Sequence, residues 1–160
     1  MKTKNVTLLQ SEELFESINL ILLEGYDAEF TVAGNSMWPF LSHERDQVIV
    51  RAKGNAPIKK GDIVLFCPEK GRYLLHRVTL LREGMFQTAG DCNCFYDGFF
   101  PKEYLNGVVI SFRRKGKTVS CQNLLYRMSS QFWMFMFPLR RHLLRLLRFY
   151  CYIKNRRKRI

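Results

Sequence analysis

Hydrophobic residues in the first 112 positions come mostly in short runs that are separated by Gly, Asp, Asn or Pro. Short strands at regular spacing, with turn residues between them, favour a mainly β body. The runs that we expect to form strands are 29–32, 47–50, 63–66, 73–81, 85–88 and 107–112. The segment that begins at Ser11 differs, because its apolar residues Leu14, Ile18 and Leu22 share one helical face until Gly25. We therefore expect an N-terminal helix.

The pattern changes after about residue 120. Phe132 to Phe137 is a continuous apolar run that Pro138 stops, and from Leu139 the spacing becomes helical. One predicted face carries Leu139, Leu143, Leu146, Leu147 and Tyr150, and another carries Arg140, Arg141, Arg145 and Arg148. The expected architecture is a compact β body of small twisted sheets with its N-terminal helix, at 1–120, and an amphipathic helical tail, at 121–160.

Charge also divides the chain, at a somewhat earlier point. The first 103 residues hold all 14 acidic residues and 12 basic ones, whereas the last 57 hold 14 basic residues and no acidic one. A nearly neutral part thus precedes a C-terminal part of about +14, which includes the tail, and such a cationic segment is expected to seek a polyanion.

The tail favours an anionic membrane surface as that polyanion. A helix with leucines on one side and arginines on another suits the interface of a bilayer, and the aromatic run before it can enter the same layer. In the alternative, the leucine face packs on the body and the arginines are solvated. Nucleic acid fits the charge, but no recognised nucleic-acid module accompanies it, and the arginines disfavour a spanning helix.

The N-terminal region and the cysteines bear on location. The apolar stretch from Leu14 to Leu23 is interrupted by polar residues, so we expect neither a secretory signal nor an N-terminal membrane anchor. Five cysteines, an odd number, favour reduced thiols, and Cys92 and Cys94 are too close and isolated for a structural zinc site. These features favour a peripheral membrane protein on the cytoplasmic side, with no metal or cofactor.

Candidate chemistry lies in the order of a serine, a histidine and two aspartates. Ser36 follows Gly34 in a turn-like segment, His76 lies in an apolar strand, and Asp91 and Asp97 follow. A hydroxyl nucleophile needs a base near neutral pKa and a group that orients that base. Each residue alone is more often structural. The other histidines are weaker candidates, because His43 lies in a polar loop and His142 among arginines.

The sequence motifs around these residues resemble those of the signal peptidase I superfamily, which includes the self-cleaving repressors. The similar words, within about residues 30–112, are Gly34-x-Ser36-Met37-x-Pro39, Asp46-x-Val48, Lys60-Gly61-Asp62-Ile63-Val64, His76-Arg77-Val78 and Gly90-Asp91-x-Asn93 with Asp97. The resemblance implies that Ser36 is the nucleophile. Where most relatives have a lysine base this chain has His76, as in the endoplasmic-reticulum and spore-former branch. Asp97 is then the first candidate to orient His76, and Asp91 the second.

The resemblance implies a serine endopeptidase that cuts an extended signal, leader or propeptide after small residues. The chain departs from the family at Gly34, where some members carry a serine as an oxyanion donor, so backbone N–H groups must serve there. The family usually carries an N-terminal membrane anchor, which we do not expect here. The self-cleaving repressors carry an N-terminal DNA-binding domain, and the roughly 30 residues before the first motif are too few for one. Two alternatives stay open: a non-cleaving peptide- or membrane-binding protein on the same fold, and a protein whose cationic tail is the functional part.

Overall fold

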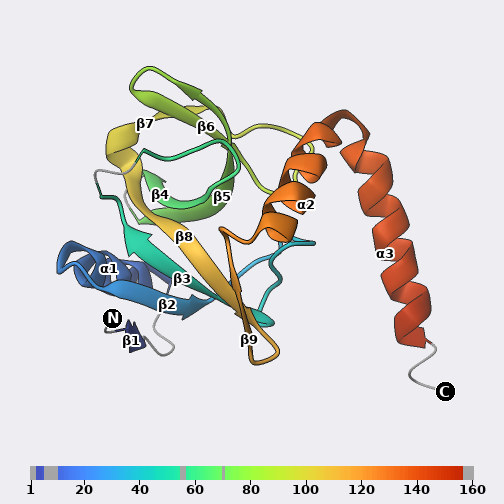
Figure 1. Ribbon diagram of the computed structural model, residues 1–160, viewed down its shortest axis with the longest axis horizontal. Helices are drawn as coiled ribbons and strands as arrows, with labels where there is room; N and C mark the ends of the chain where they lie inside the picture. Colours follow the sequence, from blue (N-terminus) through green and yellow to red (C-terminus); the bar gives the residue numbers. More distant parts are fainter. Residues whose placement is uncertain (1–2, 6–10, 55–56, 70, 157–160) are drawn as a thin grey trace.

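A mainly β body with helices at both ends makes up the protein, as the hydrophobic pattern predicts (Figure 1). The computed structural model describes residues 3–5, 11–54, 57–69 and 71–156, so part of the basic C-terminal run, at 157–160, lies outside the described residues. The strands are β1 (Thr3–Asn5), β2 (Asp27–Thr31), β3 (Asp46–Ala52), β4 (Ile63–Glu69), β5 (Arg72–Arg82), β6 (Met85–Ala89), β7 (Phe99–Pro101), β8 (Leu105–Arg114) and β9 (Lys117–Ser120). The helices are α1 (Ser11–Leu23), α2 (Leu124–Phe135) and α3 (Arg140–Arg156), with short 3-10 turns η1 (Lys102–Tyr104) and η2 (Phe137–Leu139).

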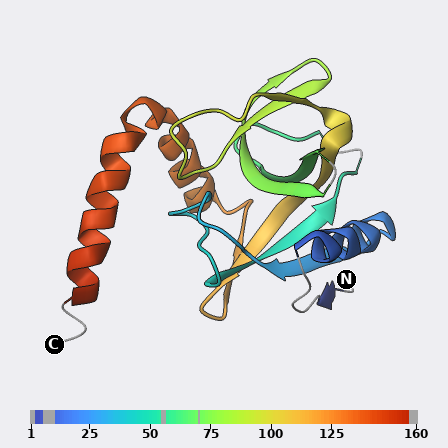
Figure 2. The ribbon, with the colours of Figure 1, turned by 180° about the vertical axis from the view of Figure 1, so that it is seen from behind.

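The strands join into one continuous sheet rather than separate small ones. Their order is β1-β2-β3-β8-β4-β5-β6-β7. β4 pairs with the first residues of β8, at 105–108, and β9 pairs with its last residues, at 111–114. β1 runs parallel to β2 and the other pairs are antiparallel. Figures 1 and 2 show that the sheet curls, so that β4 to β7 form a rounded half beside the flatter half of β2 and β3. β8 crosses between the two halves.

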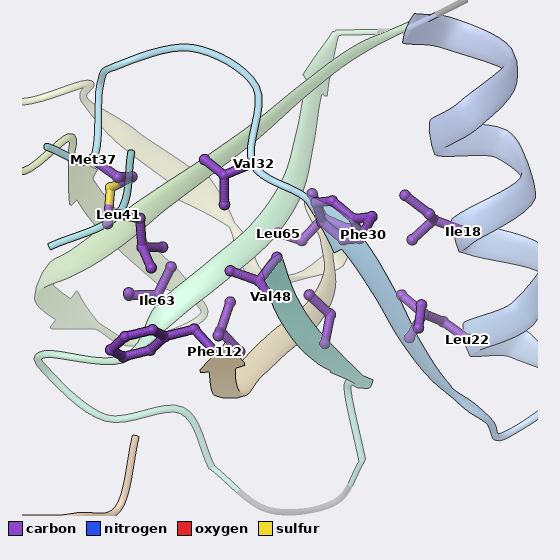
Figure 3. Close-up of a cluster of buried hydrophobic side chains, with 13 residues drawn as sticks. Ile18, Leu22, Phe30, Val32, Met37, Leu41, Val48, Ile63, Leu65 and Phe112 are labelled. Atoms are coloured by element: carbon purple, nitrogen blue, oxygen red, sulfur yellow. The ribbon is translucent and has the colours of Figure 1, made fainter. Parts of the chain in front are cut away.

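Each half of the sheet has its own hydrophobic core. In the first, Ile18 and Leu22 of α1 pack against Phe30 of β2 and Val48 of β3 (Figure 3). The second core lies within the rounded half and consists of Ile58, Val64, Phe66, Val78, Phe86 and Leu105. Both cores are continuous with strands that lead to the candidate site.

The helix α2 is an element that the hydrophobic pattern did not reveal. Asn123 caps it by accepting hydrogen bonds from the backbone N–H groups of Leu125 and Tyr126. The face that packs on the body carries Tyr126, Ser130 and Trp133, of which Ser130 and Trp133 are buried. A polar serine in the middle of this face hides its helical period, so the sequence indicated only the apolar run near the helix end.

The tail packs on the body more closely than an extended interfacial helix would. In α3, Leu144 is buried and Leu143 and Leu147 are half-buried, whereas Leu146 and Tyr150 are exposed, so the predicted leucine face is only partly covered by protein. Arg140 departs from the predicted arginine face, because it is 1% exposed and fully surrounded by protein. The rest of α3 reaches away from the sheet at the edge of the molecule (Figures 1 and 2).

Candidate active site

Ser36 lies in the loop between β2 and β3. Hydrogen bonds at the two ends of this loop and buried side chains within it hold the loop in place. The backbone N–H of Val32 donates to Asp46 (2.9 Å), and that of Glu44 donates to Val32 (3.0 Å), closing the base of the loop. Met37 and Leu41 point into the first core (Figure 3) and are almost fully buried. The residue before Met37 is therefore kept near the surface, and Ser36 is half-buried. The turn into it uses Gly34 at φ +81°, a conformation that disfavours other residues.

His76 lies buried in β5, opposite Val64 of β4, and contacts a carboxylate. Its Nδ1 is 2.6 Å from Oδ2 of Asp97, and the hydroxyl of Thr88 donates to the same oxygen over 2.8 Å. The backbone N–H of Asp97 in turn donates to the carbonyl of Thr88 (2.9 Å). With Nδ1–H as the donor to Asp97, Nε2 is left as an acceptor, and it makes no hydrogen bond within the described residues. This is the arrangement that a general base requires.

Asp91, the second candidate partner of His76, contacts Arg77 instead. Both of its carboxylate oxygens accept from the Arg77 guanidinium, at 2.8 and 2.6 Å, and both side chains are 1% exposed. Burial lowers the pKa of Arg77, but the adjacent Asp91 carboxylate more than offsets this, so that the pKa lies above its usual range. The pair fastens the loop after β6 to β5, one residue along from His76. Asp91 is thus placed as a structural anchor, and Asp97 contacts the imidazole.

The same loop, residues 90–98, contacts the Ser36 segment. The backbone N–H of Cys92 donates to the carbonyl of Ser36 over 2.7 Å. A Cβ atom on Gly90 would lie 2.7 Å from that carbonyl oxygen, so only glycine allows this approach. The 90–98 loop therefore holds both Ser36 and, through Asp97, His76. The two side chains are not hydrogen-bonded to each other within the part of the chain that the structure describes, which is common in substrate-free sites.

Backbone groups at Ser36 are available to stabilise negative charge. Among the described residues, the N–H groups of Ser36 and Met37 find no acceptor, whereas that of Gly34 donates to Nδ1 of His43 (3.2 Å). Unused donors beside a nucleophile can bind an oxyanion. His43 is half-exposed and occupied by this contact, so its role here is to support the turn.

An open cleft lies beside Ser36. It has a volume of about 450 Å³ and is lined by Asn35, Trp38, Cys92, Arg148, Cys151 and Tyr152. One wall thus comes from the Ser36 loop, and the other from α3. A cleft that begins at the residue next to the candidate nucleophile has room for an extended peptide chain.

The tail also contacts the 90–98 loop from its other side. The indole N–H of Trp133 donates to the carbonyl of Asp91 (3.0 Å), and Arg140 donates to the carbonyls of Gly90 (3.1 Å) and Asn93 (3.0 Å). In addition, the rings of Phe137 and Tyr96 stack with centroids 4.2 Å apart. Burial lowers the pKa of Arg140. These contacts could not be predicted from the sequence, because Arg140 resembles the exposed arginines that follow it.

Thr88 is a further residue that the sequence did not single out. It is fully buried at the end of β6, and its hydroxyl fixes the Asp97 carboxylate. A threonine in a strand carries no separate signal, because β-branched residues are common there.

Neither a metal centre nor a membrane span is found within the described residues. They contain no group of three or more His, Cys, Asp or Glu side chains that could hold a metal ion. Their helices also lack the combination of length and apolar character that crossing a bilayer requires.

In comparisons with known proteins, no family model matches this chain. No curated protein is significantly similar to it.

Proposed function

We propose that the protein is a serine endopeptidase of signal-peptidase type. The observation that supports this most is the 2.6 Å contact between His76 and Asp97, made by a loop that also binds the backbone of Ser36. The three residues are those that the order of the sequence motifs suggested. A buried imidazole with one nitrogen on a carboxylate and the other free is suited to activating a hydroxyl.

In the proposed mechanism, Nε2 of His76 takes the hydroxyl proton as Ser36 Oγ attacks the carbonyl of the scissile peptide bond. Asp97 keeps the proton on Nδ1 and stabilises the imidazolium that forms. The backbone N–H groups of Ser36 and Met37 donate to the oxyanion. His76 then gives its proton to the leaving amine, and a water molecule, activated in the same way, hydrolyses the acyl-enzyme.

The substrate follows from the resemblance and from the cleft. An extended segment with small residues before the cut, such as a signal, leader or propeptide, would lie in the cleft between the Ser36 loop and α3. Trp38 and Tyr152 offer apolar surface, and Arg148 offers a positive charge. The residues of the substrate near α3 are therefore expected to be apolar or acidic.

The test is co-expression of candidate precursors with the wild type or with Ser36→Ala, followed by mass spectrometry. The wild type should yield two fragments, and Ser36→Ala should lower the cleavage rate by roughly four to six orders of magnitude. Ser17→Ala on α1, where the hydroxyl only bonds the carbonyl of Glu13, is the matched control and should cleave normally. If Ser36→Ala keeps the biological function with the precursor uncut, the protein is a non-cleaving binder on this fold.

A further inference from the structure

The outward side of α2 is a continuous apolar surface that no described residue covers. It carries five large side chains that are each 60–80% exposed: Leu124, Leu125, Met128, Phe132 and Phe135. These positions recur every three or four residues, opposite the face that holds Trp133 on the body. Isolated exposed hydrophobic residues are ordinary, but a whole helix face of them marks an interaction surface.

The outward side of α3 continues this character. Leu146, Phe149, Tyr150 and Ile153 are exposed and share one side of the helix. Arg141 and Arg145 are exposed on the adjacent side. We call the nine apolar side chains of the two helices, with these arginines, the α2–α3 face. The sequence predicted an exposed apolar surface on the second tail helix, and the structure shows that α2 carries one as well. Arg140 is buried and so does not belong to the charged part of this surface.

Charge decides between the possible occupants of this face. The last 57 residues carry 14 basic and no acidic residues, so a second copy would bring one strongly positive surface against another. Nucleic acid would satisfy the arginines but would leave Phe132, Phe135 and their neighbours in water. An anionic lipid surface satisfies both, because its headgroups pair with arginine and its acyl boundary accepts leucine and phenylalanine.

We infer that the α2–α3 face binds the interface of an anionic bilayer, with its apolar side chains in the headgroup and acyl boundary and its arginines on lipid phosphates. Binding of this kind is peripheral. It does not depend on the proposed peptidase activity, since none of the residues of the face belongs to the Ser36 and His76 site.

Flotation of the full-length protein with lipid vesicles tests the inference. At low salt the protein should float with vesicles of equal parts phosphatidylcholine and phosphatidylglycerol, and much less with phosphatidylcholine alone. The double variant Phe132→Ser/Phe135→Ser should reduce partitioning by about tenfold or more for each ring removed. The matched control is Leu20→Ser/Leu23→Ser, which removes two similarly exposed side chains from α1, and it should float like the wild type.

A second variant keeps the test valid if the phenylalanine variant does not fold, as judged by its thermal unfolding. Arg141→Gln/Arg145→Gln changes only exposed groups and should weaken binding to anionic vesicles by roughly tenfold or more, with little effect on binding to neutral ones. The inference is overturned if the wild type stays unbound at low salt, or if it binds neutral and anionic vesicles equally. It is also overturned if the face instead forms a dimer that Phe132→Ser/Phe135→Ser dissociates, or if the protein retains nucleic acid but not vesicles.

Discussion

The two aspartates after β6 lie six positions apart in one loop and yet have different physical tasks. Asp91 is 1% exposed and neutralises a guanidinium that is equally buried, whereas Asp97 contacts the imidazole of His76. Their sequence surroundings do not distinguish them, since each stands beside a glycine in a turn-like segment. The path of the loop decides which carboxylate reaches His76, and that path depends on the Arg77 contact.

Substitution of each aspartate should therefore give a different defect. Asp97→Asn should lower kcat by about four orders of magnitude with little change in unfolding, because the amide favours the wrong imidazole tautomer. Asp91→Asn should lower the free energy of unfolding by about 3 kcal/mol, because it leaves the Arg77 charge buried without its counter-charge. Peptide-cleavage kinetics and urea unfolding of the two variants measure these effects. Loss of stability in Asp97→Asn with full activity would contradict the assignment.

At the scale of elements, the Ser36 loop and the 90–98 loop meet backbone to backbone. The contact requires that Gly90 have no side chain, since a Cβ atom would collide with the carbonyl of Ser36. The sequence motif containing Gly90 thus has a steric meaning that its resemblance alone does not explain.

Gly90→Ala should separate the two loops and reduce cleavage while leaving the cores intact. We expect a loss of at least about tenfold in kcat/KM, since displacing a catalytic group by an ångström costs as much or more. Gly54→Ala is the matched control, because Gly54 has open space around its Cβ position and an ordinary backbone conformation. Equal activity of the two variants would show that the loop contact does not position Ser36.

The far end of the Ser36 loop has its own anchor, which should depend on pH. Burial raises the pKa of Asp46, but hydrogen bonds from Arg45, Arg114 and the backbone N–H of Ser42 outweigh it, so that the pKa lies below its ordinary value of 3.8. A carboxyl group of this kind contributes stability that is complete above the unfolded-state pKa and is lost as the pH falls through the folded-state value.

The protein should therefore lose stability below about pH 4, with Asp46 as one contributor. Asp46→Asn should lower the free energy of unfolding at pH 7 by about 2 kcal/mol and should weaken its dependence on pH in that acidic range. Chemical unfolding at several pH values measures both effects. An unchanged acid slope in Asp46→Asn would assign the dependence to other carboxylates.

The elements differ in how well the sequence could reveal them. β5 and β8 are long enough for their apolar runs to stand out, and α1 shows a clean helical period before Gly25. β7 and β9 have three and four residues, which is too short for any period. The serine, histidine and two aspartates could be found from their order. The supporting contacts of Thr88, Trp133 and Arg140 could not, because they depend on residues that meet only after folding.

At the scale of the whole molecule, the tail contributes side chains to the candidate active site. Trp133 and Arg140 hold three carbonyls of the 90–98 loop, and α3 forms one wall of the cleft. A body at 1–120 and a tail at 121–160 are thus distinguished by charge but not by packing.

Arg140→Ala should show this dependence on a soluble peptide, with no membrane present. We expect the free energy of unfolding to fall by about 2 kcal/mol and cleavage to slow, because the carbonyls of Gly90 and Asn93 lose a charged hydrogen-bond donor. Its neighbour Arg141 is exposed, and Arg141→Ala should change neither quantity. Thermal unfolding and peptide kinetics measure the difference, and identical behaviour of the two variants would separate the tail from the site.

The central position of β8 also has a consequence for biosynthesis. This strand pairs with β3 on one side and with β4 on the other, so neither half of the sheet is complete until residues 105–114 have been made. Pairing between segments so distant in the chain must await the later one. Arg140, which secures the 90–98 loop, is translated later still. A nascent chain can thus contain Ser36, His76 and Asp97 and still lack the contacts that assemble them, so that the site is complete only after residue 140 has been translated.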